Sequence, residues 1–141
     1  MYARLVQVHG GTIIDCENSG RGFQIGSGVS SSTWIMGFTV RRGSFNSYPG
    51  GGGLYVSGQP PTSVTVSNSA FRENSAVQGG GLARFNSALS VYDSSFTGNT
   101  AQDSGGGLHL GAGPSPTDWP YARLESVTVS GNVVNSPGML G

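Results

Sequence analysis

The acidic side chains are the first candidates for chemistry, because enzymes that cleave polysaccharides need carboxylates that converge on one bond. A hydrolase places two carboxyl groups roughly 5–9.5 Å apart, and a lyase needs carboxylates clustered around Ca²⁺ and a basic residue. Only Asp15 and Glu17 stand two residues apart, where one strand face could carry both. No third acid stands beside them. We interpret this pair as solvated residues at a strand end and predict that the chain is not an enzyme. The other acids are Glu73, Asp93, Asp103, Asp118 and Glu125.

The histidines and the cysteine could also do chemistry, but each lacks partners in the sequence. His9 precedes two glycines, as in a fragment of a hydrolase motif, and the rest of that motif is missing. His109 lies between two leucines of an alternating strand, so we expect it to point outward into solvent. Cys16 is the only cysteine, and its carboxylate neighbours would raise the pKa of the thiol. We interpret it as a small buried hydrophobic residue and predict no metal and no cofactor.

An aromatic insertion is the best candidate for a binding site. The segment 111–121 is the longest departure from the repeat described below, and it carries Asp118, Trp119 and Tyr121 among prolines. Exposed aromatic rings on a stiff loop can stack on sugar rings or bind a protein. The alternative is that Trp119 folds back and caps the wall beneath it. Trp34 lies inside an expected strand, where we interpret it as a packing residue.

Composition excludes several classes of protein. Charged residues make up 10% of the 141 residues and the formal net charge is zero, against roughly 25% charged residues in an average domain. There is therefore no electrostatic basis for binding nucleic acid or an anionic membrane. No apolar run approaches the roughly 18 residues that a membrane span needs. We expect a single domain over residues 1–141.

A repeat is the strongest pattern in the sequence. An aromatic residue or Val is followed three residues later by Asn and then, after a polar stretch, by Gly-Gly-Gly-Leu. Complete copies span residues 71–82 and 96–108, with the Phe positions 25 residues apart (96 − 71). Degenerate copies span residues 40–54 and 129–140. Each copy has an alternating apolar stretch upstream of it, which indicates short strands.

Alignment of the copies predicts a solenoid. A unit with three short strands cannot bury its own apolar face, whereas units stacked at about 4.8 Å can. We therefore predict an all-β fold, a parallel β-helix (β-solenoid) of about five coils, and right-handed because crossovers between parallel strands almost always are. The aligned columns are Ile35, Val66, Val91 and Leu124; Val40, Phe71, Phe96 and Val129; Leu54, Leu82, Leu108 and Leu140; and Gly43, Asn74, Asn99 and Asn132.

The corners of the coil follow from its polar residues. Asparagine tolerates left-handed backbone, and its amide can bond to the asparagine of the next coil, so we predict an asparagine ladder. The glycine triplets suit a second corner that needs positive φ and has no room for a Cβ. Asp93 aligns with Asn68, which favours a turn residue over a catalyst. Glu73 aligns beside Arg42 and predicts a surface ion pair.

The paired motifs resemble the repeats of the polymorphic outer membrane protein family, right-handed β-helices of the pectin-lyase-like superfamily. That family pairs Gly-Gly-[Ala/Leu/Val/Ile] with Phe-x-x-Asn, as residues 71–82 and 96–108 do. The stretch Thr12–Asn18 resembles the opening coil of such proteins, so the resemblance covers residues 12–140. The chain departs from the family pattern at Gly43 and at 137–139, and it contains no membrane-barrel domain.

The resemblance implies an extracellular or cell-surface location and an adhesive or structural role. We expect a surface scaffold or adhesion module that binds a glycan or a protein and stacks with further coils, as a fragment of a longer solenoid. Two alternatives stay open: a fragment of a polysaccharide lyase or hydrolase, and a passive structural segment.

Overall fold

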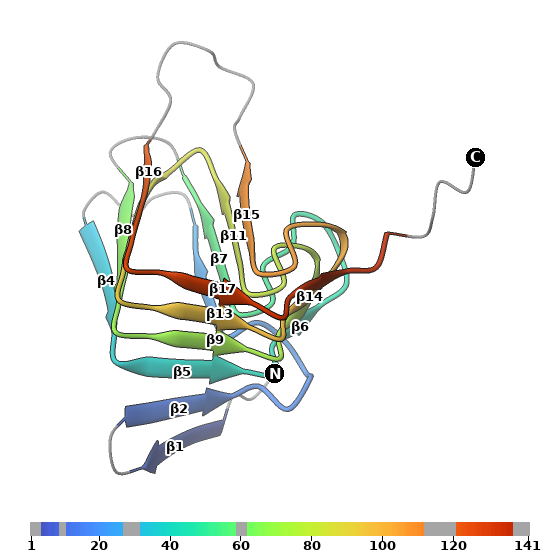
Figure 1. Cartoon of the computed structure of the whole chain (residues 1–141), viewed down its shortest axis with the longest axis horizontal. Coiled ribbons are helices and arrows are strands. Elements are labelled where there is room, and N and C mark those ends of the chain that lie inside the picture. Colours follow the sequence, from blue (N-terminus) through green and yellow to red (C-terminus); the bar gives the residue numbers. More distant parts are fainter. Residues whose placement is uncertain (1–3, 9–10, 27–31, 59–61, 112–120, 137–141) are drawn as a thin grey trace.

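The computed structural model of the chain describes residues 4–8, 11–26, 32–58, 62–111 and 121–136. These residues are all-β, with eighteen strands in four sheets that stack as a parallel solenoid (Figure 1). Within these ranges there is no helix that could cross a membrane. The predicted fold class is therefore confirmed.

The strands form four sheets, which one coil visits in the order C, A, D, B. Sheet A contains β1 (Arg4–Val8), β2 (Gly11–Asp15), β5 (Phe38–Arg41), β9 (Ala70–Arg72), β13 (Ser95–Thr97) and β17 (Thr128–Ser130). Sheet B contains β3 (Phe23–Ile25), β7 (Leu54–Ser57), β11 (Leu82–Phe85) and β15 (Leu108–Gly111). Sheet C contains β4 (Ser32–Met36), β8 (Ser63–Ser67), β12 (Ala88–Tyr92) and β16 (Ala122–Glu125). Sheet D contains β6 (Ser44–Phe45), β10 (Ser75–Gln78), β14 (Thr100–Ser104) and β18 (Val133–Val134).

The number of coils corrects the sequence prediction. Sheets B, C and D each hold four parallel strands, so the described solenoid makes about three turns rather than five. The opening residues add no turn, because β1 runs antiparallel to β2 and forms a hairpin edge of sheet A. A coil also contains four strands rather than three, because the chain turns sharply at both ends of its short sheet A strand.

The interior is built from the predicted apolar columns. Phe71 and Phe96 are wholly buried, and their rings stack in sheet A with centroids 5.0 Å apart and planes 6° apart. Val40 pairs with Phe71 on one side and Val129 with Phe96 on the other, which confirms this column. Burial of one such ring stabilises the fold by about 1.5–3 kcal/mol.

Two further columns keep the predicted register. In sheet C, Ile35, Val66, Val91 and Leu124 pair in succession. In sheet B, Leu54, Leu82 and Leu108 do the same, and Leu140 lies outside the described residues. The solenoid therefore has one continuous core that runs along its axis.

An asparagine ladder forms the corner between sheets A and D, as predicted. Oδ1 of Asn99 accepts hydrogen bonds from both Nδ2 and the backbone N–H of Asn74, each at 3.0 Å. Oδ1 of Asn132 accepts from the same two groups of Asn99, each at 2.9 Å. At the other end of the ladder, the N–H of Gly43 donates to Oδ1 of Asn74 at 2.8 Å. The Nδ2 groups also donate to sheet A carbonyls, those of Val40, Phe71 and Phe96.

The backbone at this corner corrects one prediction. The left-handed residue is the one before each ladder position: Arg42, Glu73, Gly98 and Gly131 have φ between 53° and 62°. The turn is thus made one residue early, and the asparagine that follows directs its amide along the axis rather than bending the chain itself.

The glycine triplets meet both demands that the sequence predicted. Gly79 and Gly105, the first of their triplets, have φ of 60° and 64°. A Cβ on the second glycine, Gly80, would lie 2.3 Å from the carbonyl oxygen of Thr100 in the next coil. The corner between sheets D and B therefore packs backbone directly on backbone.

A serine ladder at the corner between sheets C and A was not predicted. Oγ of Ser69 accepts from the N–H of Phe38 at 3.3 Å and donates to the carbonyl of Ser67 at 2.8 Å. Oγ of Ser94 accepts from the N–H of Ser69 at 3.1 Å and donates to the carbonyl of Tyr92 at 2.7 Å. Its only sequence signal is a serine one place after Asn68 and after Asp93, which Val127 does not continue after Ser126.

Candidate functional site

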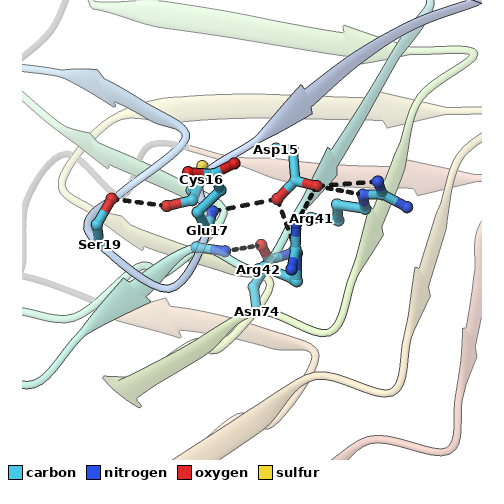
Figure 2. Close-up of polar contacts among 8 residues, drawn as sticks. Asp15, Cys16, Glu17, Ser19, Arg41, Arg42 and Asn74 are labelled. Atoms are coloured by element: carbon cyan, nitrogen blue, oxygen red, sulfur yellow. Dashed lines mark hydrogen bonds and ion pairs between the residues drawn. The ribbon is translucent and has the colours of Figure 1, made fainter. Parts of the chain in front are cut away.

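Asp15 is held inside a cage of donors at the end of β2. Figure 2 shows its carboxylate between the guanidinium groups of Arg41 and Arg42, which β5 and the following corner supply. Nε of Arg41 donates to Oδ2 at 2.9 Å and Nε of Arg42 donates to Oδ1 at 2.8 Å. Arg42 adds an ion pair to Oδ2 through Nη2, and the N–H of Glu17 donates to Oδ1 at 3.1 Å.

These contacts fix the charge of Asp15. The hydrogen bond from Arg42 lowers the pKa, burial opposes it, and the donors on Glu17 and Arg41 lower it further, to about 2. A group with this pKa cannot act as a general acid near neutral pH. The prediction that this acid pair is solvated is wrong for Asp15. Its side chain is 3% exposed, because two arginines of the next coil enclose it. Glu17 is exposed.

The same cage changes the assignment of Arg42 and affects the buried Cys16. Arg42 was expected to pair with Glu73, but its guanidinium binds Asp15 instead. That hydrogen bond is the main cause of the raised pKa of Arg42, and Glu73 adds a smaller electrostatic contribution. Cys16 is buried as predicted; burial, aided by the charge of Asp15, raises the pKa of its thiol to about 11. Such a thiol is not a nucleophile at neutral pH.

His109 lies in the predicted column, but it is partly buried rather than solvated. It pairs with Ala83, which in turn pairs with Tyr55. The ring of Phe85 lies 5.3 Å from the imidazole, centroid to centroid, and partial burial lowers the pKa of His109. The imidazole is therefore neutral near pH 7.

One hydroxyl contacts this histidine. Oγ of Ser104 lies 3.0 Å from Nδ1 of His109. A hydrolytic triad would need an acid to orient the imidazole, and among the described residues no carboxylate bonds to it. Asp103, next to Ser104 in β14, accepts a hydrogen bond from the hydroxyl of Tyr48 instead. Within the described ranges the pair therefore lacks the third member of a triad.

The outer face of sheet C carries two exposed aromatic side chains, and it is the strongest candidate for a binding site. Trp34 in β4 is 63% exposed, and Tyr121, directly before β16, is 62% exposed. Thr65, Ser90 and Arg123 align with Trp34 on successive strands, and Tyr121 lies two residues before Arg123. Three strand steps separate β4 from β16, which is about 14 Å along the axis. We call this surface, Trp34, Thr65, Ser90 and Tyr121, the sheet C strip.

Trp34 corrects the interpretation of this residue as a packing residue. Its neighbour Ile35 takes the inward place in β4, so strand alternation directs Trp34 outward. Charge on the rest of this face is balanced. Arg123 donates to Glu125 at 2.8 Å and lies over the ring of Tyr92, 5.7 Å from its centroid. The face therefore offers stacking surfaces and hydroxyls without a net charge.

A polar groove of about 620 Å³ adjoins this face at the corner between sheets C and A. Small polar side chains line it, among them Thr39, Asn68, Asp93, Ser95, Ser126 and Thr128. Asn68, Asp93 and Ser126 are corner residues with φ between 46° and 54°, which confirms Asp93 as a turn residue. Asp93 is the one carboxylate in this lining, so the groove lacks the acid pair of a glycoside hydrolase.

The structure places only part of the predicted binding site. Tyr121 is exposed at the edge of sheet C, where its carbonyl accepts the N–H of Leu89 at 3.0 Å. Asp118 and Trp119 lie outside the described residues, as does His9. Trp34, which complements Tyr121 on the same face, could have been found from the sequence by its place next to Ile35 in an alternating strand.

Within the described ranges, no three His, Cys, Asp or Glu side chains gather to hold a metal ion. Comparison with known protein families, curated proteins and solved structures found no match to this chain.

Proposed function

We propose that this chain is a non-catalytic β-solenoid scaffold that binds a neutral glycan on the outer face of sheet C. The observation that carries the proposal is the sheet C strip, in which the hydroxyl residues Thr65 and Ser90 follow exposed Trp34 and exposed Tyr121 lies at the edge of the same sheet. Aromatic faces stack on sugar rings, and hydroxyls exchange hydrogen bonds with sugar hydroxyls.

A glycan suits this surface better than a protein partner does. Protein hot spots are clustered aromatic and Arg side chains in a desolvated centre, whereas these two aromatics are separated by three strand steps, about 14 Å along the axis. The cation of Arg123 is engaged by Glu125, so the face does not select an anionic ligand. Strands that repeat at a fixed spacing favour an extended ligand that crosses several coils.

The polysaccharide-cleaving alternative finds little support in the carboxylates. Asp15 is caged by arginines, Asp103 accepts from Tyr48, and Glu125 pairs with Arg123. Asp93 alone lines the groove. Release of reducing ends or of unsaturated products from a bound polysaccharide, lost in Asp93→Asn, would replace the scaffold proposal with an enzyme.

The proposal also includes a family assignment. We assign the chain to the right-handed β-helices that resemble polymorphic outer membrane protein repeats, with a place on the outer surface of the cell. The support is that each motif residue has a structural role: Phe stacks, Asn forms the ladder and Gly packs the corner. Labelling intact cells with an antibody to this chain tests the location, and labelling only after permeabilisation contradicts it.

The test of binding uses affinity electrophoresis of the purified chain through gels that contain neutral polysaccharides. Trp34→Ala and Tyr121→Ala should each weaken retardation about tenfold or more, because each removes a stacking surface. Both side chains are mostly exposed, so the melting temperature should hardly change. Trp119→Ala is measured beside them to test the predicted contribution of the insertion.

A matched control separates stacking from a general loss of aromatic surface. Tyr48 is 64% exposed and lies between β6 and β7, away from sheet C, so Tyr48→Ala should leave retardation unchanged. Unchanged retardation in Trp34→Ala and Tyr121→Ala would reject the sheet C strip as the site. Capture of a protein instead of a polysaccharide, lost in the same two variants, would favour the protein alternative.

A further inference from the structure

Arg72 is a cation on the outer face of sheet A that lies outside every ion pair in the described part of the chain. It ends β9, where Phe71 takes the inward place, so strand alternation directs the Arg72 side chain outward. The ion pairs among the described residues engage three other arginines: Arg41, Arg42 and Arg123. Glu73, the next residue in the chain, is exposed to solvent instead.

The guanidinium of Arg72 is partly withdrawn from water. The side chain is half-buried, and its Nε is buried without a hydrogen-bond partner among the described residues. A charge that loses part of its hydration is stabilised by a counter-ion and by charge-assisted hydrogen bonds. Arginine has five N–H donors, so the four on its two Nη atoms remain for a ligand. The group is therefore suited to hold an anion at the surface.

Arg21 shows how an arginine is satisfied within this solenoid without a carboxylate. Its Nε and Nη2 donate to the carbonyl of Gly50 at 3.0 and 2.7 Å, and its guanidinium lies 3.3 Å from the ring centroid of Phe45. Within the described ranges Arg72 has neither a carbonyl acceptor nor an aromatic ring of this kind. Its charge is left for something outside these residues.

The polar groove at the corner between sheets C and A lies beside Arg72. Ala70 and Ser95 line the groove, and they precede Arg72 and Thr97 by two places on neighbouring strands. Residues two places apart share one face of a strand and stand about 7 Å apart. A guanidinium on its three-carbon stem can span that distance. Arg72 therefore reaches the groove, with the hydroxyls of Ser95 and Thr97 in the adjacent coil.

Asp93 stands on the opposite wall of the groove. It is exposed at the corner before β13, and it is the one carboxylate in the lining. Its negative charge opposes a second negative charge on any ligand that Arg72 holds. The groove therefore favours a ligand with a single negative charge on the Arg72 side.

We propose that Arg72, Ser95 and Thr97 bind the sulfate group of a sulfated sugar. A sulfate monoester has one negative charge and three free oxygens, so the guanidinium and the two hydroxyls can each meet one oxygen. A phosphate monoester carries about −1.5 to −2 charges at pH 7, which Asp93 disfavours. A carboxylate presents two oxygens in one plane and leaves one of the three groups without an acceptor. This site on sheet A is separate from the neutral-glycan site on sheet C.

The test is an NMR titration of the full chain with glucose 6-sulfate as the probe. The backbone amide signals of residues 95 and 97 should shift and saturate. We expect the dissociation constant to rise about tenfold or more in Arg72→Gln and about threefold in Ser95→Ala. Asp93→Asn should lower it severalfold, because the opposing charge is removed.

The controls separate the sugar from the anion and this arginine from any other. Glucose without sulfate should cause no shift, and glucose 6-phosphate and methyl sulfate should each bind more weakly than glucose 6-sulfate. Arg123→Gln removes an exposed arginine on sheet C and should leave the affinity unchanged. If circular dichroism shows that Arg72→Gln does not fold, Arg72→Lys replaces it, because lysine keeps the charge without the planar fork.

Three results would overturn the proposal. Unchanged affinity in the Arg72 and Ser95 variants would place the anion elsewhere. Equal binding of methyl sulfate and glucose 6-sulfate would make this a site for a free anion rather than a sugar. Tighter binding of glucose 6-phosphate would contradict the role given to Asp93. Trp34→Ala should leave sulfate binding unchanged, so a failure of this site and a failure of the sheet C strip are seen in different variants.

Discussion

Phe96 and Val129 occupy neighbouring places in one column of sheet A, yet their surroundings differ. Phe96 is wholly buried between two coils, whereas Val129 is 51% exposed. The same contrast holds in the ladder, where Asn99 is buried and Asn132 is partly exposed. The difference teaches that a residue in this fold is buried by the coil that follows it as much as by its own. Stability is therefore a sum of contacts between neighbouring coils.

The largest loss of stability is expected for the buried member of this column. Phe96→Ala should lower the free energy of unfolding by about 3–5 kcal/mol, because it leaves a cavity and removes the stack on Phe71. Val129→Ala should cost about 1 kcal/mol or less, because the side chain is half exposed already. Urea unfolding followed by circular dichroism measures both, and equal costs would mean that the last coil is as buried as the middle ones.

The ladder offers a second, smaller test. Asn99→Ala should cost about 1–3 kcal/mol, because both donors of Asn74 lose their acceptor inside the solenoid and the Oδ1 of Asn132 keeps only the backbone N–H of residue 99. Asn132→Ala should cost less, because Asn132 is itself partly exposed and water can reach the position that its amide leaves. Thermal unfolding of the two variants checks the order, and an unchanged melting temperature for Asn99→Ala would show that the ladder does not stabilise the fold.

A third test concerns the ion-pair cage around Asp15. The folded-state pKa of Asp15 is lowered from 3.8 to about 2. Its contribution is therefore fully present above pH about 3.8, and about 2 kcal/mol is lost as the pH falls through about 2. The pH dependence of urea unfolding should show this loss in the wild type and not in Asp15→Asn. The same acid limb in both proteins would mean that other carboxylates cause it.

Much of the fold could be predicted because the repeat fixes register. Once Phe71 and Phe96 were aligned, the glycine and asparagine positions followed, and the structure confirms these pairings. Corner geometry was less accessible. The asparagine was expected to be the left-handed residue, but Glu73 and Gly98 before the asparagines take that place. Spacing alone does not say which of two adjacent residues turns the chain.

Side-chain environments were harder to predict than register. Asp15 was expected in solvent, and its burial depends on Arg41 and Arg42, which lie a full coil later in the chain. Trp34 was interpreted as a packing residue, although alternation with Ile35 directs it outward. For Asp15 the neighbours that decide burial are distant in sequence, whereas for Trp34 the deciding signal is local alternation in β4.

Backbone hydrogen exchange tests most directly the central claim, that each coil is completed by the next. The N–H of Asn99 donates to Asn132 inside the solenoid, whereas the N–H of Asn132 has no partner among the described residues. We expect exchange of the Asn99 amide to require unfolding of the coils, and exchange of the Asn132 amide to be close to that of an exposed group. Equal protection of both amides in the isolated chain would contradict the account.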